Sequence, residues 1–148
     1  MKSTECTDID SLIIEQMADA MIYSDKDGVI RGWNAAAESL FGYAKDDAIG
    51  QSLDLIIPEH LREAHWSGFN RAMASGTTRL AGLATITRSL TRTKGSIYVE
   101  MSFAVVSDGN GTVTGSVAVA RDATQRRQKE RALRERLEIL EKLHPGAV

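Results

Sequence analysis

The segment SIYVEMSFAVV, residues 96–106, decides the fold because an apolar side chain recurs at every second position. The apolar members of this alternation are Ile97, Val99, Met101, Phe103 and Val105. A period of two places them on one face of a β-strand and the intervening side chains on the other. The pattern therefore predicts a strand with one buried face.

Two further strands flank this segment. Residues 79–91 are rich in Leu, Ile and Thr, which favour a long strand, and Lys94-Gly95 predicts a turn after it. On the other side, residues 108–111 read Asp-Gly-Asn-Gly, a tight turn that leads into a strand over residues 112–120. Three consecutive strands with short turns indicate an antiparallel sheet.

The N-terminal half adds two shorter strands and several helices. Apolar runs at 21–23 and 29–33 flank Asp27-Gly28, a hairpin signal. Asn34 suits the N-cap of a helix that Gly42 ends, and residues 45–49 form another helical turn. Helices between two sets of antiparallel strands predict an α+β fold in which a five-stranded sheet carries helices on one face.

A longer helix is predicted by PEHLREAHWSGFNRAMASG, residues 58–76. Pro58 suits the first turn, and Gly76 can adopt the left-handed conformation that ends a helix. The residues that share one helical face are Leu61, His65, Gly68, Phe69, Ala72 and Met73. This face is apolar except for His65.

Gly68 lies one turn after His65 and removes a side chain beside the imidazole. A glycine inside a helix costs about 1 kcal/mol relative to alanine, so we expect it to make room for something. An imidazole on an apolar wall beside a gap suits a ligand of a metal ion or a haem iron. It also suits a core histidine whose ring is hydrogen-bonded to a backbone carbonyl, the more common situation for a buried polar group.

Composition indicates one globular domain with an appendage: 148 residues, 43% hydrophobic and 26% charged. The net charge of -2 predicts attraction neither to nucleic acid nor to a membrane surface. No apolar run approaches the roughly 18 residues of a membrane span, and the N-terminus lacks the apolar region of a signal peptide. We therefore expect a cytoplasmic location.

The sequence offers little catalytic chemistry. Cys6 is the only cysteine, which excludes an intramolecular disulfide and a CxxC pair. No nucleophile–base set, phosphate loop or HxxxH pair is evident, and the five-residue spacing of His60 and His65 places them on different helical faces. We expect the chain not to be an enzyme.

The C-terminal segment is highly charged and contains a stripe at Leu133, Leu137 and Leu140. We expect an amphipathic helix, capped by Thr124, that pairs with a second copy as a short coiled coil. The alternative is a helix folded back on its own sheet. The expected organisation is a tail over 1–8, a domain over 9–122, this helix over 123–144 and a tail over 145–148.

Three motifs together resemble the PAS family: DGVIRGWNAAAESLFGYAKDDAIGQSL at 27–53, TKGSIYVEMSFAVV at 93–106 and TGSVAVARDAT at 114–124. The resemblance covers about residues 9–124. It implies a sensor module in which a five-stranded antiparallel sheet and short helices enclose a ligand pocket. It further implies that the C-terminal helix carries the signal to an output domain or protein that the sequence does not identify.

Within this family, GQSLDLIIPEHLREAHWSGFNRAMASG at 50–76 is most similar to the haem-binding PAS domains of rhizobial oxygen-sensing histidine kinases. The resemblance implies a b-type haem whose proximal iron ligand is His65. It also implies that Arg71 and Arg79 lie near the haem propionates. The function expected from it is a response to a diatomic gas (O2, CO or NO) or to redox state.

The pattern departs from these relatives on the far side of the haem. Their long strand carries an arginine for bound oxygen, whereas this chain has Thr85 at that position and Arg88 three residues later. The expected distal pocket of Leu83, Thr85, Met101 and Phe103 is largely apolar, which disfavours O2 relative to CO or NO. Met101 is a candidate sixth iron ligand, or it simply packs in the core.

Two other functions remain open at this stage. A photochemical flavin–thiol adduct is excluded because the segment before the long helix contains no cysteine, but non-covalent binding of FAD or FMN is possible. Alternatively, the chain is a PAS module for dimerisation or interaction with no ligand or another small molecule. In each case the expected partner is a second copy, joined through the PAS domain and the C-terminal helix.

Overall fold

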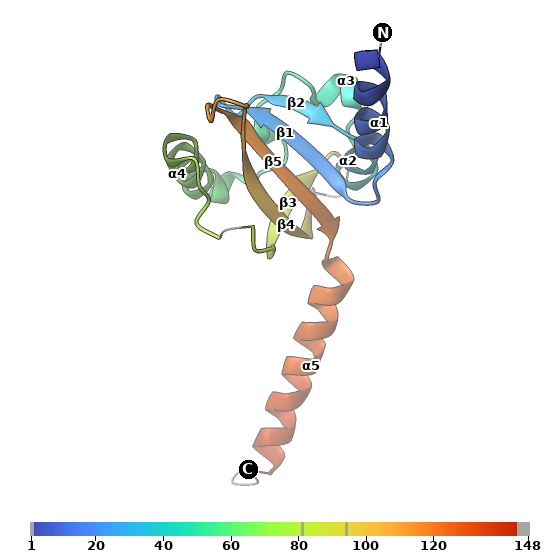
Figure 1. The fold of residues 1–148 in the computed structure, drawn as a ribbon. Coiled ribbons are helices and arrows are strands. Elements are labelled where there is room, and N and C mark those ends of the chain that lie inside the picture. Colours follow the sequence, from blue (N-terminus) through green and yellow to red (C-terminus); the bar gives the residue numbers. More distant parts are fainter. Residues whose placement is uncertain (1, 81, 94, 145–148) are drawn as a thin grey trace.

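A computed structural model describes residues 2–80, 82–93 and 95–144 (Figure 1). In chain order its elements are α1 (Lys2–Gln16), β1 (Ala20–Asp25), β2 (Ile30–Trp33), α2 (Ala35–Phe41), α3 (Lys45–Ala48), the 3-10 turn η1 (Leu53–Leu55), α4 (Glu59–Ser75), β3 (Thr85–Thr91), β4 (Gly95–Ser107), β5 (Val113–Asp122) and α5 (Thr124–Leu143). In this described part, no helix combines the length and the apolar character needed to cross a lipid bilayer.

The strands form one antiparallel five-stranded sheet in the order β2-β1-β5-β4-β3. The α+β fold predicted from the sequence is therefore confirmed. The alternation predicted in β4 is also confirmed over Ile97, Val99 and Met101, which are buried against the core. Beyond them Phe103 is 37% exposed, because this end of the strand borders a cavity instead of packed side chains.

Asn34 joins three elements through one buried amide. Its Oδ1 accepts from the backbone N–H of Ala37, as predicted for the N-cap of α2, and also from that of Met21 in β1. Its Nδ2 donates to the carbonyls of Ile14 in α1 and Asp19. Both atoms of this amide are thus satisfied, so the side chain is stable in the interior and fixes the start of the sheet.

The long strand predicted over residues 79–91 is wrong in its first part, since β3 begins only at Thr85. Gly82 adopts the left-handed conformation (φ 83°), and the N–H of Leu83 donates to the carbonyl of Leu80 at 2.9 Å. This turn interrupts the extended backbone. The apolar residues Leu80 and Leu83, which suggested a strand, lie instead in the loop before β3 and line a cavity together with α4.

Two expectations at the helix ends are also wrong. The segment 1–8 was expected to be a tail, but α1 begins at Lys2, since no proline or glycine interrupts residues 2–16. Thr124 does not cap α5 with its side chain: its hydroxyl accepts from the N–H of Tyr98, and the Asp122 carboxylate accepts from the N–H of Thr124 at 2.7 Å. The expected tail at 145–148 lies outside the described residues.

Helix α5 extends away from the domain (Figure 1), and the alternative in which it folds back on the sheet is not observed. Its start is bound to β4: the N–H of Ala123 donates to the carbonyl of Tyr98 at 2.9 Å, and Arg126 forms an ion pair with Glu100. The apolar side chains that α5 leaves exposed are Leu133, Leu137, Ile139, Leu140 and Leu143.

The contact between β1 and β5 depends on a glycine and generates a stability test. A Cβ at Gly115 would lie 1.9 Å from the carbonyl oxygen of Ser24, so Gly115→Ala forces the two strands apart. We expect it to lower the free energy of unfolding by about 1–3 kcal/mol in chemical denaturation.

Gly109→Ala is the matched control, because a Cβ there meets nothing within 4 Å. We expect it to change the free energy of unfolding by no more than about 0.5 kcal/mol. Equal effects of the two substitutions would contradict the close approach of β1 and β5.

Candidate functional site

Helix α4 approaches the sheet through few side chains. It starts after Pro58 and ends at Gly76 in the left-handed conformation (φ 76°), as predicted. Phe69 is the one residue of this helix that is buried. The helix lies beside the sheet (Figure 1), and residues of both line two cavities.

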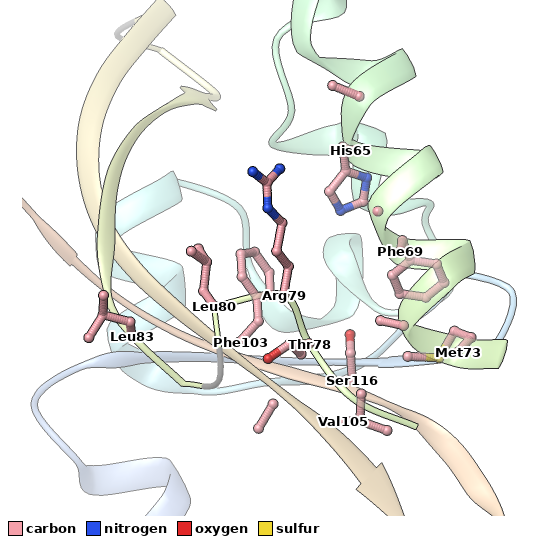
Figure 2. A pocket seen from close by; sticks show the side chains of 14 residues that line it. His65, Phe69, Met73, Thr78, Arg79, Leu80, Leu83, Phe103, Val105 and Ser116 are labelled. Carbon is pink, nitrogen blue, oxygen red and sulfur yellow. The ribbon is translucent and has the colours of Figure 1, made fainter. Parts of the chain in front are cut away.

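The first cavity, of about 330 Å³, lies between α4, the loop before β3 and strands β4 and β5 (Figure 2). Its walls are Ala64, His65, Gly68, Phe69, Ala72, Met73, Thr78, Arg79, Leu80, Leu83, Phe103, Ala104, Val105 and Ser116. The second cavity, of about 320 Å³, is lined by Ile22, Leu53, Ile56, Ile57, Leu61, Ala64, His65, Thr85, Thr87, Arg88, Ser89, Met101, Phe103 and Ala118. Each volume falls in the range of small-molecule sites, about 300–1,000 Å³.

His65 borders both cavities, together with Ala64 and Phe103. The side chains predicted to share its helical face all line one cavity or the other: Leu61, His65, Gly68, Phe69, Ala72 and Met73. The face inferred from helical spacing therefore points towards the space between α4 and the sheet.

The imidazole of His65 has no hydrogen-bond partner for its buried Nδ1 among the described residues. Burial lowers the pKa of His65 below its ordinary value, and the nearby Asp54 carboxylate opposes this shift only in part. The ring is therefore neutral at pH 7, with a lone pair available to a ligand. At Nδ1 the ring therefore lacks the backbone carbonyl partner expected of a satisfied core histidine.

Gly68 faces the first cavity, and a Cβ built on it would meet nothing within 4 Å. No neighbouring side chain therefore requires a glycine here. The space predicted beside the imidazole is present. It is part of the first cavity and is not filled by a neighbouring side chain.

The two arginines expected near propionates lie in different places. Arg79 lines the first cavity, and Figure 2 shows its side chain extending towards the level of His65. Arg71 lines neither cavity; its Nη2 donates to the Ser67 hydroxyl on the exposed side of α4 at 3.4 Å. Arg71 lies six positions after His65 on α4, and this spacing turns its side chain away from the face that carries His65.

The single distal pocket expected from the sequence is divided. Leu83, 67% exposed, borders the first cavity, whereas Thr85 and the buried Met101 border the second; Phe103 lines both. The division follows from the turn before β3, which moves Leu83 out of the strand that carries Thr85.

Arg88 belongs to the residues around the second cavity, but its guanidinium is engaged elsewhere. Its Nη2 donates to the Tyr98 hydroxyl at 3.0 Å, and its guanidinium carbon lies 5.1 Å from the centre of that ring. This hydrogen bond lowers the pKa of Tyr98. Arg88 and Tyr98 are register partners across β3 and β4, with no bulge to turn Arg88 inwards.

Several lining residues were missed from the sequence. Thr78 and Leu80 were assigned to a strand, and Gly82 was the signal for the loop that brings them to the first cavity. Ser116 and Ala118 lie in β5, and their small side chains gave no hint of a cavity. Ser89 was also missed; it is buried and donates to the carbonyl of Ile56 at 2.8 Å.

The described residues contain no group of three or more His, Cys, Asp or Glu side chains arranged to hold a metal ion. The chemistry that the site offers is a neutral, partly buried imidazole between two largely apolar spaces, with one guanidinium at the edge of the first.

Curated proteins similar to this chain include sensors. The sensor protein FixL of Bradyrhizobium diazoefficiens is 32% identical over 124 residues, which cover 83% of this chain and 24% of that protein. The oxygen sensor protein DosP of Escherichia coli is 30% identical over 117 residues, covering 78% of this chain and 14% of DosP. The chain thus spans a quarter or less of the length of these relatives.

Solved structures share the fold. A PAS domain from Colwellia psychrerythraea matches with a TM-score of 0.70 at 22% identity, covering 81% of this chain and 98% of that one. An RNA-binding light-oxygen-voltage receptor matches with a TM-score of 0.74 at 23% identity, covering 97% of this chain and 40% of that one.

The family model of the PAS fold matches residues 10–123, which include the whole sheet, α4 and both cavities. Taken with the observed strand order and the resemblance in sequence to FixL and DosP, this match establishes that the chain belongs to the PAS family.

Proposed function

We propose that this PAS domain is a sensor that binds b-type haem between α4 and the sheet, with His65 as the proximal iron ligand. The observation that carries the proposal is the imidazole of His65, neutral and unpartnered at Nδ1, on the border of two cavities. A buried polar atom without a partner is rare in proteins and calls for an explanation such as an absent ligand.

The surrounding residues fit the chemistry of a haem. Imidazole is a common axial ligand of haem iron, and the cavity walls are mostly apolar, as the porphyrin face requires. Arg79 supplies a guanidinium at the first cavity that would pair with a propionate. Phe69 and Phe103 would contact the macrocycle. When bound, the haem supplies an iron that takes a diatomic gas or changes its redox state.

The residues of the second cavity bear on which gas is preferred. Met101 and Ala118 are apolar, Ser89 already donates to Ile56, and the Arg88 guanidinium is bonded to Tyr98. Thr85 and Thr87 are left as weak polar contacts. We therefore expect CO or NO to be favoured relative to O2, with Met101 as a candidate sixth ligand.

The comparisons support sensing at a coarser level. DosP is named an oxygen sensor and FixL a sensor protein, and both align over more than three quarters of this chain. We propose that the chain is a sensor and not an enzyme, since Nδ1 of His65 has no hydrogen-bond partner among the described residues that would orient it as a base. We further propose that an output domain or a separate protein receives the signal.

The route of the signal is proposed to run through β4. One face of this strand borders the cavities at Met101 and Phe103, while Tyr98 and Glu100 on the other face hold the start of α5. A change at the cavities would therefore reach α5 through a single strand. The exposed leucine stripe of α5 would pair with a second copy, whose coiled-coil geometry is the element that switches.

The first test is the visible absorption spectrum of the protein purified from iron-supplemented cells. We expect a Soret band that His65→Ala abolishes or shifts, because the iron loses its protein ligand. His60→Ala is the matched control: His60 is exposed on another face of α4, so its loss should leave the band unchanged.

The same spectra separate the alternatives. A yellow protein with flavin bands would establish non-covalent FAD or FMN binding in place of haem. A protein that stays colourless after haem is added would contradict haem binding and leave a PAS module for dimerisation or for another small molecule.

Gly68→Ala distinguishes a ligand site from ordinary packing. Its Cβ meets nothing within 4 Å, so we expect the haem-free protein to gain up to about 1 kcal/mol of unfolding free energy from the better helix former. The same methyl group enters the first cavity, so we expect weaker haem binding in a titration. Haem affinity equal to that of the wild type would contradict a haem lying against Gly68.

Removal of α5 after Thr124 should weaken dimerisation, measured by sedimentation of the truncated and complete chains. Leu137→Ala should act in the same direction, because it shortens the exposed leucine stripe. Glu135→Ala, on the opposite side of the helix, should not. A truncated protein that dimerises as tightly as the complete chain would disprove the role of α5.

A further inference from the structure

Trp66 follows His65 in α4, and the sequence alone left its role open. Its side chain is half-buried against the core but lines neither cavity. Its indole Nε1 donates to Oδ1 of Asp54 in η1 at 2.8 Å. The donor of the indole is therefore satisfied by a carboxylate, an arrangement stronger than a hydrogen bond between neutral groups.

Gly28 fixes the other end of the indole. A Cβ built on Gly28 would lie 2.2 Å from Cη2 and 2.3 Å from Cζ3 of Trp66, so the ring lies directly against the glycine backbone. Gly28 also has a φ of 76° in the turn between β1 and β2. Only glycine at this position leaves room for the indole, because any Cβ would overlap the ring.

The fixed indole contacts the imidazole. The rings of His65 and Trp66 lie edge to face, with centroids 4.7 Å apart and planes at 77°. The imidazole is also stacked on Phe69 at 5.9 Å and 30°, and Trp66 meets Phe69 edge to face at 5.2 Å. The three rings form a cluster that limits how far the imidazole plane can rotate.

The segment around Asp54 also anchors the first turns of α4. Arg62 donates from Nε to the carbonyl of Ile57 at 3.1 Å and from Nη2 to the carbonyl of Asp54 at 3.4 Å. Its Nε lies 3.8 Å from Oδ1 of Asp54. The helix that carries His65 and the ring that contacts His65 are therefore held by the same short segment.

We infer that Trp66, fixed between the Asp54 carboxylate and Gly28, is the positioning residue that sets the plane of the His65 imidazole. The effect of this positioning on an axial ligand rests on the proposed haem function. The orientation of the imidazole, in contrast, is a property of the haem-free protein and can be measured there. A ligand held in a single orientation binds its iron without first losing rotational freedom, so groups that orient a ligand affect affinity although they do not touch the metal.

The first test uses the haem-free protein and proton NMR of the aromatic rings. We expect cross-peaks between His65 and the rings of Trp66 and Phe69 in the wild type. Trp66→Phe lacks both the indole N–H and the ring that reaches Gly28, so the cross-peaks from His65 to Phe69 should be lost. Asp54→Ala keeps the indole but removes its acceptor, and it should shift the His65 ring resonances and weaken the same cross-peaks.

Trp33→Phe is the matched control. Trp33 is the other tryptophan; its Nε1 donates to the carbonyl of Tyr43 at 3.0 Å, and its ring pairs with Phe41 away from the cavities. The substitution removes a comparable indole hydrogen bond but leaves the ring cluster intact. We expect the cross-peaks of His65 to be unchanged in it.

The second test measures haem loss to an excess of haem-free myoglobin. Trp66→Phe and Asp54→Ala should each release haem about tenfold faster than the wild type, the lower end of the effect of orienting groups. Trp33→Phe should release it within about twofold of the wild-type rate. In the same samples, the iron–histidine stretching band in resonance Raman spectra should broaden or shift only in the first two.

The two tests separate this inference from the proposed function. A wild type that binds no haem would overturn the haem proposal while NMR still decides the orientation of His65. Unchanged NMR cross-peaks in Asp54→Ala, a variant that keeps every ring of the cluster, would overturn the positioning role even if haem binds. Equal haem loss from Trp66→Phe and Trp33→Phe would overturn it as well.

Discussion

The structure depends on how little of α4 is packed against the sheet. Phe69 is the one side chain of the helix that is buried, and the helix is otherwise held at its start by Asp54, through Trp66 and Arg62. A helix held in this way leaves apolar surface uncovered, and the two cavities lie along that surface. The domain therefore lacks the hydrophobic stabilisation that a closely packed helix would have contributed. Such a loss is typical of ligand-binding segments, which belong to the less stable parts of proteins.

The rest of the domain is connected by buried contacts. The amide of Asn34 joins α1, β1 and α2, and the central pairing of β1 with β5 brings Gly115 against the backbone of Ser24. Strand β4 then connects the open side with α5, because successive side chains of a strand point to opposite faces. Met101 borders a cavity, whereas Glu100 forms an ion pair with Arg126 in α5. The same strand therefore contacts both a cavity and the helix α5.

Periodicity predicted the parts of the site that regular elements carry. The helical face with His65, Gly68 and Phe69 and the strand face with Met101 and Phe103 both border the cavities as inferred. Periodicity was wrong where a turn interrupts an apolar run, as at Gly82, and that error misplaced Leu83 and hid Leu80. Arg71 shows a different limit: similarity to relatives suggested a propionate partner, but the helical rotation of this chain turns it towards Ser67.

The sequence by itself determined the elements, their order and the family, because these follow from local patterns: period two in β4, the cap at Asn34, and Pro58 and Gly76 at the ends of α4. Only the tertiary structure decided that His65 lacks a partner for Nδ1, that Arg88 is bonded to Tyr98, and that Trp66 lies between Asp54 and Gly28. These facts depend on contacts between residues from 10 to 38 positions apart, such as Arg88 with Tyr98 and Gly28 with Trp66. No local pattern encodes such contacts, since they arise only when the sheet and α4 have packed together.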